Sequence, residues 1–160
     1  MIKKKKKINV IEVSLGDKIK VGDAFFYIIS PMNDLIEENA INNNSIVCKL
    51  VSNNFTMLFT GDIEKEAENR LVKLNYDLKS DILKVAHHGS ISSSIEEFLD
   101  LVKPKIAIIG VGKDNKFDHP NNIVIKRLED RNCKIYRTDE MGEIMIRVNK
   151  FGIISVDKFI

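Results

Sequence analysis

The chain has 160 residues, of which 44% are hydrophobic, and a formal net charge of +2. This length and apolar content suffice for one compact domain with its own core. The small net charge gives no argument for a nucleic-acid partner by itself. No apolar run reaches the ~18 residues that a membrane-spanning helix needs. We therefore expect a single soluble domain over residues 1–160.

The N-terminus carries the strongest block of charge, Lys3–Lys7. We expect residues 1–7 to form a disordered, solvated basic tail, with a nucleic-acid-binding arm as the alternative. A signal peptide is not expected, because the lysines lead into the short alternating segment Ile8–Val13 and not into an apolar run. The two cysteines, Cys48 and Cys133, lie in strand-like stretches and are interpreted as buried free thiols, with a disulfide as the alternative.

The first half of the chain predicts mainly strands. After Ile8–Val13, glycine turns separate further strands, and the polar, Asn-rich segment Met32–Asn44 is predicted to be a loop that is possibly mobile. A hairpin turned at Asn53-Asn54 follows. The predicted strands after Ile8–Val13 are Lys18–Val21, Ala24–Ser30, Ser45–Ser52 and Phe55–Phe59.

The second half alternates helices with strands, which is typical of an α/β sheet. Apolar residues at helical spacing predict a helix over Ile63–Leu74, and Asp62 stands where its N-cap would be. Two further helices are predicted, and the last three strands are expected to close the sheet. The remaining predicted elements are strands Ile82–Ala86, Ile106–Val111, Lys134–Arg137, Glu143–Val148 and Ile153–Val156, and helices Ile95–Val102 and Asn121–Arg131.

Two apolar runs end abruptly at residues with metal-ligand chemistry. Met57–Thr60 leads into Gly61-Asp62, and Ile82–Ala86 leads into His87-His88-Gly89. Because carboxyl ends of neighbouring strands meet in one crevice of an α/β sheet, we expect these side chains to lie together. Carboxylate and imidazole donors suit Zn²⁺ or Mn²⁺.

Each motif also has an ordinary structural interpretation. Gly-Asp after a strand is often only a turn, Asp62 can cap a helix, and a His-His pair can sit at a strand end for packing. His119, fixed by the following Pro120, can likewise be a turn residue. One strand–helix–strand unit separates Asp62 from His87, which places the two strand ends side by side and favours a site.

These residues resemble the metallo-β-lactamase fold, and most of all the C-terminal hydrolase domain of ComEC-type competence proteins, which take DNA into bacteria. The resemblance rests on Thr60–Asp62 with Glu68, on Asp81–Ser90 and on Ser92–Ser94. It continues through Pro104–Gly110, Asn115–Pro120, Tyr136–Asp139 and Gly142, and so runs from about Asn42 to Val148. It implies an α/β, layered αββα fold, of which this chain carries mainly the second half.

The family opens its site with a His-x-(His or Asp)-x-Asp-His loop in the first half of the fold. This chain has no histidine before His87. We therefore expect a truncated, split or trimmed protein with an incomplete two-metal site, completed by an upstream segment. The face of the sheet that would meet the first half should be apolar and exposed, or self-associated.

The resemblance also implies roles for individual residues. Asp62, His87, His88 and His119 are the candidate ligands of one or two Zn²⁺ or Mn²⁺ ions, and Asp62 and His88 the candidate catalytic residues. Ser90 and Asn115 are candidate substrate contacts. The substrate implied is single-stranded DNA, and a full competence protein would place the domain at the membrane.

Three functions stay open from the sequence. The first is a metal-dependent hydrolase of the competence type that cleaves phosphodiesters. The second is a metallo-hydrolase of another substrate class, and the third a non-catalytic remnant or interaction module of the same fold.

Overall fold

The computed structural model describes residues 9–52 and 54–159. The predicted basic tail therefore lies outside the described residues. Residues 9–13 of the predicted strand Ile8–Val13 form no strand. An alternating pattern of apolar and polar residues is thus not sufficient for a strand when no neighbouring strand pairs with the segment.

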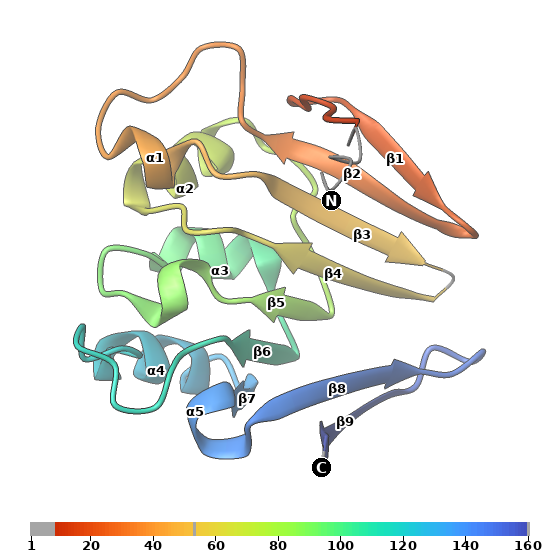
Figure 1. Ribbon diagram of the computed structural model, residues 1–160, viewed down its shortest axis with the longest axis vertical. Helices are drawn as coiled ribbons and strands as arrows, with labels where there is room; N and C mark the ends of the chain where they lie inside the picture. The colour runs from red at the N-terminus through yellow and green to blue at the C-terminus, as the bar shows by residue number, and fades with distance from the viewer. Residues whose placement is uncertain (1–8, 53, 160) are drawn as a thin grey trace, which may run out of the picture.

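One sheet of seven strands forms the centre of the molecule, and its strands follow one another in chain order (Figure 1). The first four are antiparallel, and β4 to β7 are parallel. The strands are β1 (Lys18–Val21), β2 (Ala24–Ser30), β3 (Val47–Ser52), β4 (Phe55–Phe59), β5 (Ile82–Lys84), β6 (Ile106–Ile109) and β7 (Lys134–Arg137).

Three helices connect the parallel strands and pack on one face of the sheet (Figure 1). They are α2 (Lys65–Lys73), α3 (Glu96–Val102) and α4 (Asn122–Glu129). The strand side chains of Leu58, Leu83 and Ala107 are in register and fully buried in the core between sheet and helices. Right-handed crossovers explain why all three helices lie on the same side, as predicted from the sequence.

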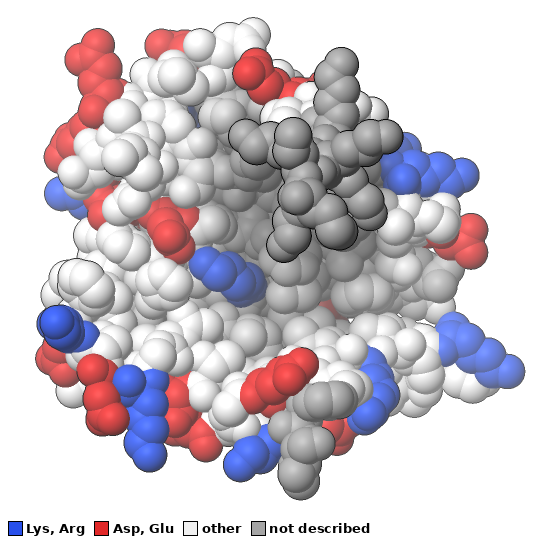
Figure 2. All heavy atoms as spheres, in the orientation of Figure 1, with Lys and Arg blue, Asp and Glu red and all other residues white. Residues whose placement is uncertain are grey.

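The face opposite the helices is apolar, and Figure 2 shows charged side chains mostly at its rim. Along β2, β3, β4 and β6, it carries Phe26, Leu50, Phe59, Ile106 and Ile108, which are half-buried. The sequence predicted this apolar character, but the side chains are less exposed than expected.

The C-terminal strands β8 (Glu143–Val148) and β9 (Ile154–Phe159) form a separate two-stranded sheet. The prediction that they close the main sheet was wrong. The short helix α5 (Thr138–Met141) follows β7 directly and turns the chain away, so β8 does not pair with β7 (Figure 1).

The Asn-rich segment, predicted to be a loop that is possibly mobile, is held by hydrogen bonds of its own side chains. It contains the short helix α1 (Ala40–Asn43), and Asn43 is completely buried. The Asn43 amide donates to the Glu38 carbonyl (2.8 Å), and its oxygen accepts from the backbone N–H of Glu64 (3.0 Å). Local sequence missed this because the partner of Asn43 lies 21 residues away.

Both cysteines are free, Cys133 buried and Cys48 half-buried. Among the described residues, no helix is long and apolar enough to cross a membrane.

Candidate metal centre at the carboxyl ends of β4, β5 and β6

The chemically active side chains follow three neighbouring parallel strands. Asp62 follows β4, His87 and His88 follow β5 in the 3₁₀ turn Ala86–Gly89, and His119 lies in the loop between β6 and α4. The carboxyl ends of parallel strands meet at one edge, where α/β proteins build their sites. The topology therefore confirms the prediction that these residues follow adjacent strands.

The sequence had suggested Asp62 as the N-cap of the following helix. In the structure, Asp62 does not cap that helix. Helix α2 begins at Lys65, after the extended residue Glu64, and Asn43 accepts hydrogen bonds from the backbone N–H groups at its start. The Asp62 carboxylate is thus free for other contacts. Its Oδ1 lies 3.5 Å from Lys84 Nζ and 3.8 Å from His88 Nε2.

His88 is oriented by a backbone carbonyl. Its Nδ1 lies 2.5 Å from the Gly110 oxygen at the end of β6. A carbonyl oxygen can only accept, so Nδ1 carries the proton and the neutral ring keeps its lone pair on Nε2. That lone pair is on the atom nearest to Asp62. Anchoring one ring nitrogen so that the other can bind an ion is the usual arrangement of metal-ligating histidines.

His87 has a different environment, although it is the next residue. Both histidines have left-handed backbone conformations, with φ of 45° and 55°. Such conformations are uncommon for non-glycine residues and are found at functional sites. His87 Nδ1 is buried without a hydrogen-bond partner, 3.1 Å from Glu64 Oε1. Its ring centroid lies 6.3 Å from that of His88 and 5.8 Å from that of His119.

His119 lies beside this pair and is half-buried. Burial and the neighbouring His87 and His88 lower the pKa of His119, which favours the neutral form able to donate a lone pair to a metal. The Asn115 side chain shapes the loop: its amide donates to the His119 carbonyl (2.7 Å), and its oxygen accepts from the His119 N–H (3.0 Å).

The two candidate substrate contacts are engaged within the protein. Asn115 holds its own loop as described, and Ser90 is buried, with its hydroxyl 3.0 Å from that of Ser92. Ser90 was expected near the site and outside the core; it lies two residues after His88, but it is buried, at 7% exposure. Its N–H donates to the His87 carbonyl (2.8 Å), which closes the 3₁₀ turn.

Two charged residues of the site were not predicted from the sequence. Lys84 donates to the Gly61 carbonyl (2.6 Å) and lies beside Asp62, and burial lowers its pKa. Glu64 is buried behind His87. A signal existed for Lys84, because it is the one charged residue of the apolar run Ile82–Ala86. Glu64 gave none, since the first turn of many helices carries acidic residues.

The donor set fits a divalent ion in chemistry and in part in geometry. Asp62 offers oxygen, His88 an oriented nitrogen, and His87 a buried ring nitrogen that lacks a partner. Zn²⁺ and Mn²⁺ accept such oxygen and nitrogen donors. Within residues 9–52 and 54–159, however, no group of three or more His, Cys, Asp or Glu side chains is close enough to hold an ion.

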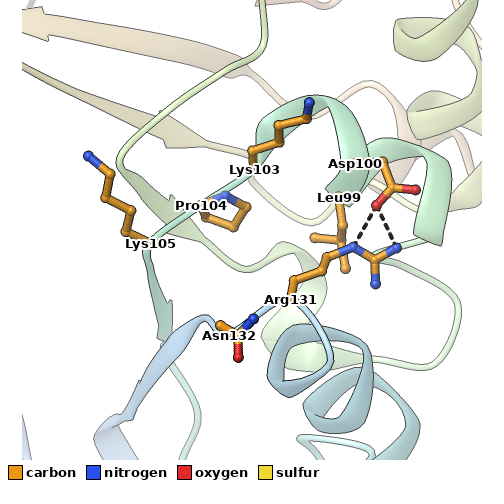
Figure 3. Close-up of a pocket in the computed structure, with 7 residues that line it drawn as sticks. All are labelled: Leu99, Asp100, Lys103, Pro104, Lys105, Arg131 and Asn132. Atoms are coloured by element: carbon orange, nitrogen blue, oxygen red, sulfur yellow. Dashed lines mark hydrogen bonds and ion pairs between the residues drawn. The ribbon is translucent and has the colours of Figure 1, made fainter.

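A cavity of about 600 Å³ lies elsewhere, where the end of α3 meets the start of β6 (Figure 3). It is lined by Asp100, Lys103, Lys105, Arg131 and Asn132, with Leu99 and Pro104. Its basic groups are largely paired: Arg131 binds Asp100 (2.8 Å), and Lys105 binds Asp81 (2.8 Å). We therefore assign the cavity no part in the candidate metal centre.

The fold and the site together define an α/β protein with carboxylate and imidazole donors at the ends of its parallel strands. Residues 21–113, more than half of the chain, match the family described as Metallo-beta-lactamase superfamily. The chain therefore belongs to the metallo-β-lactamase superfamily, which uses divalent metal ions.

Three curated relatives match most of this chain, and one of them is named a competence protein. ComE operon protein 3 of Bacillus subtilis is 36% identical over 93% of this chain, which spans 19% of that relative. Competence protein ComA of Neisseria gonorrhoeae is 34% identical over 70% of the chain and 16% of its own length. Recombination protein 2 of Haemophilus influenzae is 35% identical over 79% of the chain and 15% of its own length. The chain thus spans less than a fifth of each.

A solved structure has the same fold. It is a putative metal-dependent hydrolase from Parabacteroides distasonis, with a TM-score of 0.52, 13% sequence identity, and coverage of 79% of this chain and 56% of that one. The likeness confirms the predicted metallo-β-lactamase fold.

Proposed function

We propose that this domain hydrolyses phosphodiesters of single-stranded DNA with a divalent metal, as part of DNA uptake. The observation that carries the proposal is the pair Asp62 Oδ1 and His88 Nε2, 3.8 Å apart, with the His88 lone pair fixed by Gly110. The competence name of one relative supports the choice of DNA as substrate.

Asp62 and His88 are the central donors in this proposal. His88 would offer Nε2, Asp62 would offer carboxylate oxygen, and His87 and His119 would contribute from the sides. A bound Zn²⁺ or Mn²⁺ would supply Lewis acidity to the reacting phosphate and water. The chain's part is to hold the donors in place and, at His119, to favour the neutral imidazole.

The position of Lys84 supports the proposal that the substrate is an anion. Its ammonium lies at the same strand ends as Asp62, and a quarter of its side chain is exposed. A positive charge at this position attracts a phosphate and compensates the negative charge that develops on its oxygens. Ser90 and Asn115 remain proposed substrate contacts, which requires their present hydrogen bonds to open.

The site needs more donors than these residues provide. A two-metal site positions both the attacking and the leaving oxygen, and two or three donors leave an ion under-coordinated. We propose that another polypeptide segment completes the site and that this chain alone binds at most one ion weakly. A metallo-hydrolase of another substrate class is the second candidate, favoured by the match to a superfamily whose description specifies no phosphodiester substrate.

The test is hydrolysis by the isolated chain with Mn²⁺ or Zn²⁺, assayed in parallel on single-stranded DNA, a simple phosphodiester and a β-lactam. We expect very low turnover, confined to DNA and the phosphodiester, and abolished by Asp62→Ala. Asp100→Ala is the matched control, because Asp100 is an exposed carboxylate outside the site.

The outcomes separate the alternatives. Equal turnover by the wild type and by Asp62→Ala would contradict the proposed site. Robust, Asp62-dependent cleavage by the chain alone would show that no further segment is needed. Hydrolysis of the β-lactam but not of DNA would favour the other substrate class.

A further inference from the structure

Glu64 is a buried carboxylate that lies behind the candidate ligand His87. It is 6% exposed, and its Oε1 is 3.1 Å from His87 Nδ1. Within the described residues, His87 is the one ion-pair partner of Glu64. A carboxylate this deeply buried is costly unless hydrogen bonds or charge compensate it. Its position therefore needs an explanation.

The Asn-rich segment before β3 supplies that compensation. Asn39 Nδ2 donates to Glu64 Oε2 (2.6 Å), Asn42 Nδ2 donates to Oε1 (3.3 Å), and Asn43 accepts from the Glu64 backbone N–H (3.0 Å). Three asparagines from one short stretch thus hold a single glutamate from 21 or more residues away. This arrangement fixes the carboxylate without neutralising it.

The fixed carboxylate faces a ring nitrogen that has no other partner. His87 Nδ1 is buried and makes no hydrogen bond, while 24% of the side chain is exposed. The exposed part of the ring is therefore not its Nδ1. A buried polar atom left unpaired is unfavourable, so a small ring rotation that forms Nδ1–H···Oε1 is favourable.

We propose that Glu64, held by Asn39 and Asn42, is a positioning residue that keeps the proton of His87 on Nδ1 and its lone pair on Nε2. His88 has the equivalent arrangement with the Gly110 carbonyl. The left-handed backbone at both residues sends the two rings to separate anchors and leaves both Nε2 atoms for a ligand. Such outer partners orient metal-ligating histidines. Only the use of this lone pair for metal rests on the proposed function.

Glu64 does not act on substrate in this account. Its oxygens are occupied by Asn39 and Asn42, and the residue is almost completely buried. A general base must reach the proton that it removes. The test must therefore report the state of His87 itself and not only turnover.

The first experiment is long-range ¹H–¹⁵N NMR of the histidine rings in the metal-free protein, at alkaline pH where imidazoles are neutral. We expect the Nδ1–H form for His87 in the wild type, a shift toward Nε2–H in Glu64→Ala, and retention of Nδ1–H in Glu64→Gln, whose amide oxygen can still accept. His88 is an internal control, because its anchor is Gly110. Glu66→Ala, in the first turn of the same helix, is the matched control.

Two results would overturn the proposal: an Nε2–H form of His87 in the wild type, or no change of its form in Glu64→Ala. Should that variant fail to fold, Asn39→Ala keeps Glu64 in the sequence but removes one of its hydrogen-bond donors. This variant should give the same shift in part. An unchanged ring there, with Glu64 shown to have moved, would also contradict the proposal.

The second experiment separates this inference from the proposed function. Titration of Mn²⁺ or Zn²⁺ into Glu64→Ala should show binding weakened about 10- to 100-fold, as for other outer partners of ligating histidines. Glu66→Ala should bind as the wild type does. If the wild type binds neither ion, the proposed function fails, and the NMR result alone still decides the role of Glu64.

Discussion

Two glycines allow the chain to bring the candidate donors together. Gly61 directly precedes Asp62, and Gly89 directly follows His88. Both glycines have positive φ, of 54° and 81°. A Cβ at Gly61 would lie 2.6 Å from Ser45 Cβ, and one at Gly89 would lie 2.6 Å from Pro120 Cβ. Neither distance is tolerable, so no other residue fits without movement.

The variant Gly89→Ala should therefore separate His119 from His87 and His88. The added methyl pushes against Pro120, and the hydrogen bond from Asn121 N–H to the Gly89 carbonyl (2.9 Å) ties the same two segments. We expect about 1–3 kcal/mol lower free energy of unfolding in denaturant. The control is Gly112→Ala in the β6–α4 loop that carries His119, where no atom lies within 4 Å of the new Cβ; similar losses in both variants would contradict this account.

Local pattern was sufficient for the donors that follow strands, because an apolar run ending in a glycine turn is visible in a short window. Asp62, His87 and His88 were placed at strand ends in this way, and their role as metal donors stays a prediction. Glu64 and Lys84 were not, since their roles depend on contacts with His87 and Asp62 that only the folded sheet creates.

At the scale of elements, α2 and α3 are joined by a buried carboxylate. Glu68 of α2 is fully buried and accepts the backbone N–H of Ser94 (2.7 Å) and of Ile95 (2.8 Å), which precede α3. It thus satisfies N–H groups that the start of a helix leaves unpaired. Burial raises the pKa of Glu68 to about 7, although both hydrogen bonds act against the rise.

This shift predicts a pH dependence of stability. Between the ordinary pKa of 4.5 and about 7, the unfolded chain has lost the proton of Glu68 and the folded chain keeps it. The contribution of Glu68 to the free energy of unfolding should therefore be complete below pH 4.5 and fall by up to about 3 kcal/mol as pH rises through 7.

Denaturation of the wild type and of Glu68→Gln across this pH range checks the prediction. The variant should be less stable, because its amide places a donor against one N–H, but it should lack this component of the pH dependence. Parallel pH profiles of the two proteins would contradict the assignment to Glu68.

Element boundaries show where sequence patterns stop being informative. The helix predicted from Ile63 begins at Lys65, because Asn43 and not Asp62 pairs with its first N–H groups. The strand predicted to Ala86 ends at Lys84, and the turn Ala86–Gly89 with its two left-handed histidines begins two residues later. Both ends are decided by contacts between distant segments.

At the scale of the whole molecule, the sheet has one face covered by helices and one apolar face. Order, direction and handedness of the main sheet follow from the alternation of strands and helices. The separate β8–β9 sheet does not, because α5 redirects a chain whose alternating pattern fits either sheet.

The apolar face predicts self-association. Phe26 lies on it, and its neighbour Tyr27 points to the other side of β2, so the two residues form a matched pair. In sedimentation velocity, we expect an apparent mass that rises with concentration and a shift toward monomer in Phe26→Lys but not in Tyr27→Lys. A wild type that stays monomeric at all concentrations would contradict this prediction.

The central claim is that Asp62 and His88 form part of a metal centre, and binding of Mn²⁺ and Zn²⁺ by isothermal titration tests it most directly. Asp62→Ala, His88→Ala and the control Asp100→Ala should be compared with the wild type. We predict weak binding of at most one ion, retained in Asp100→Ala and lost in the other two variants. No binding by the wild type, or unchanged binding in Asp62→Ala and His88→Ala, would contradict the claim.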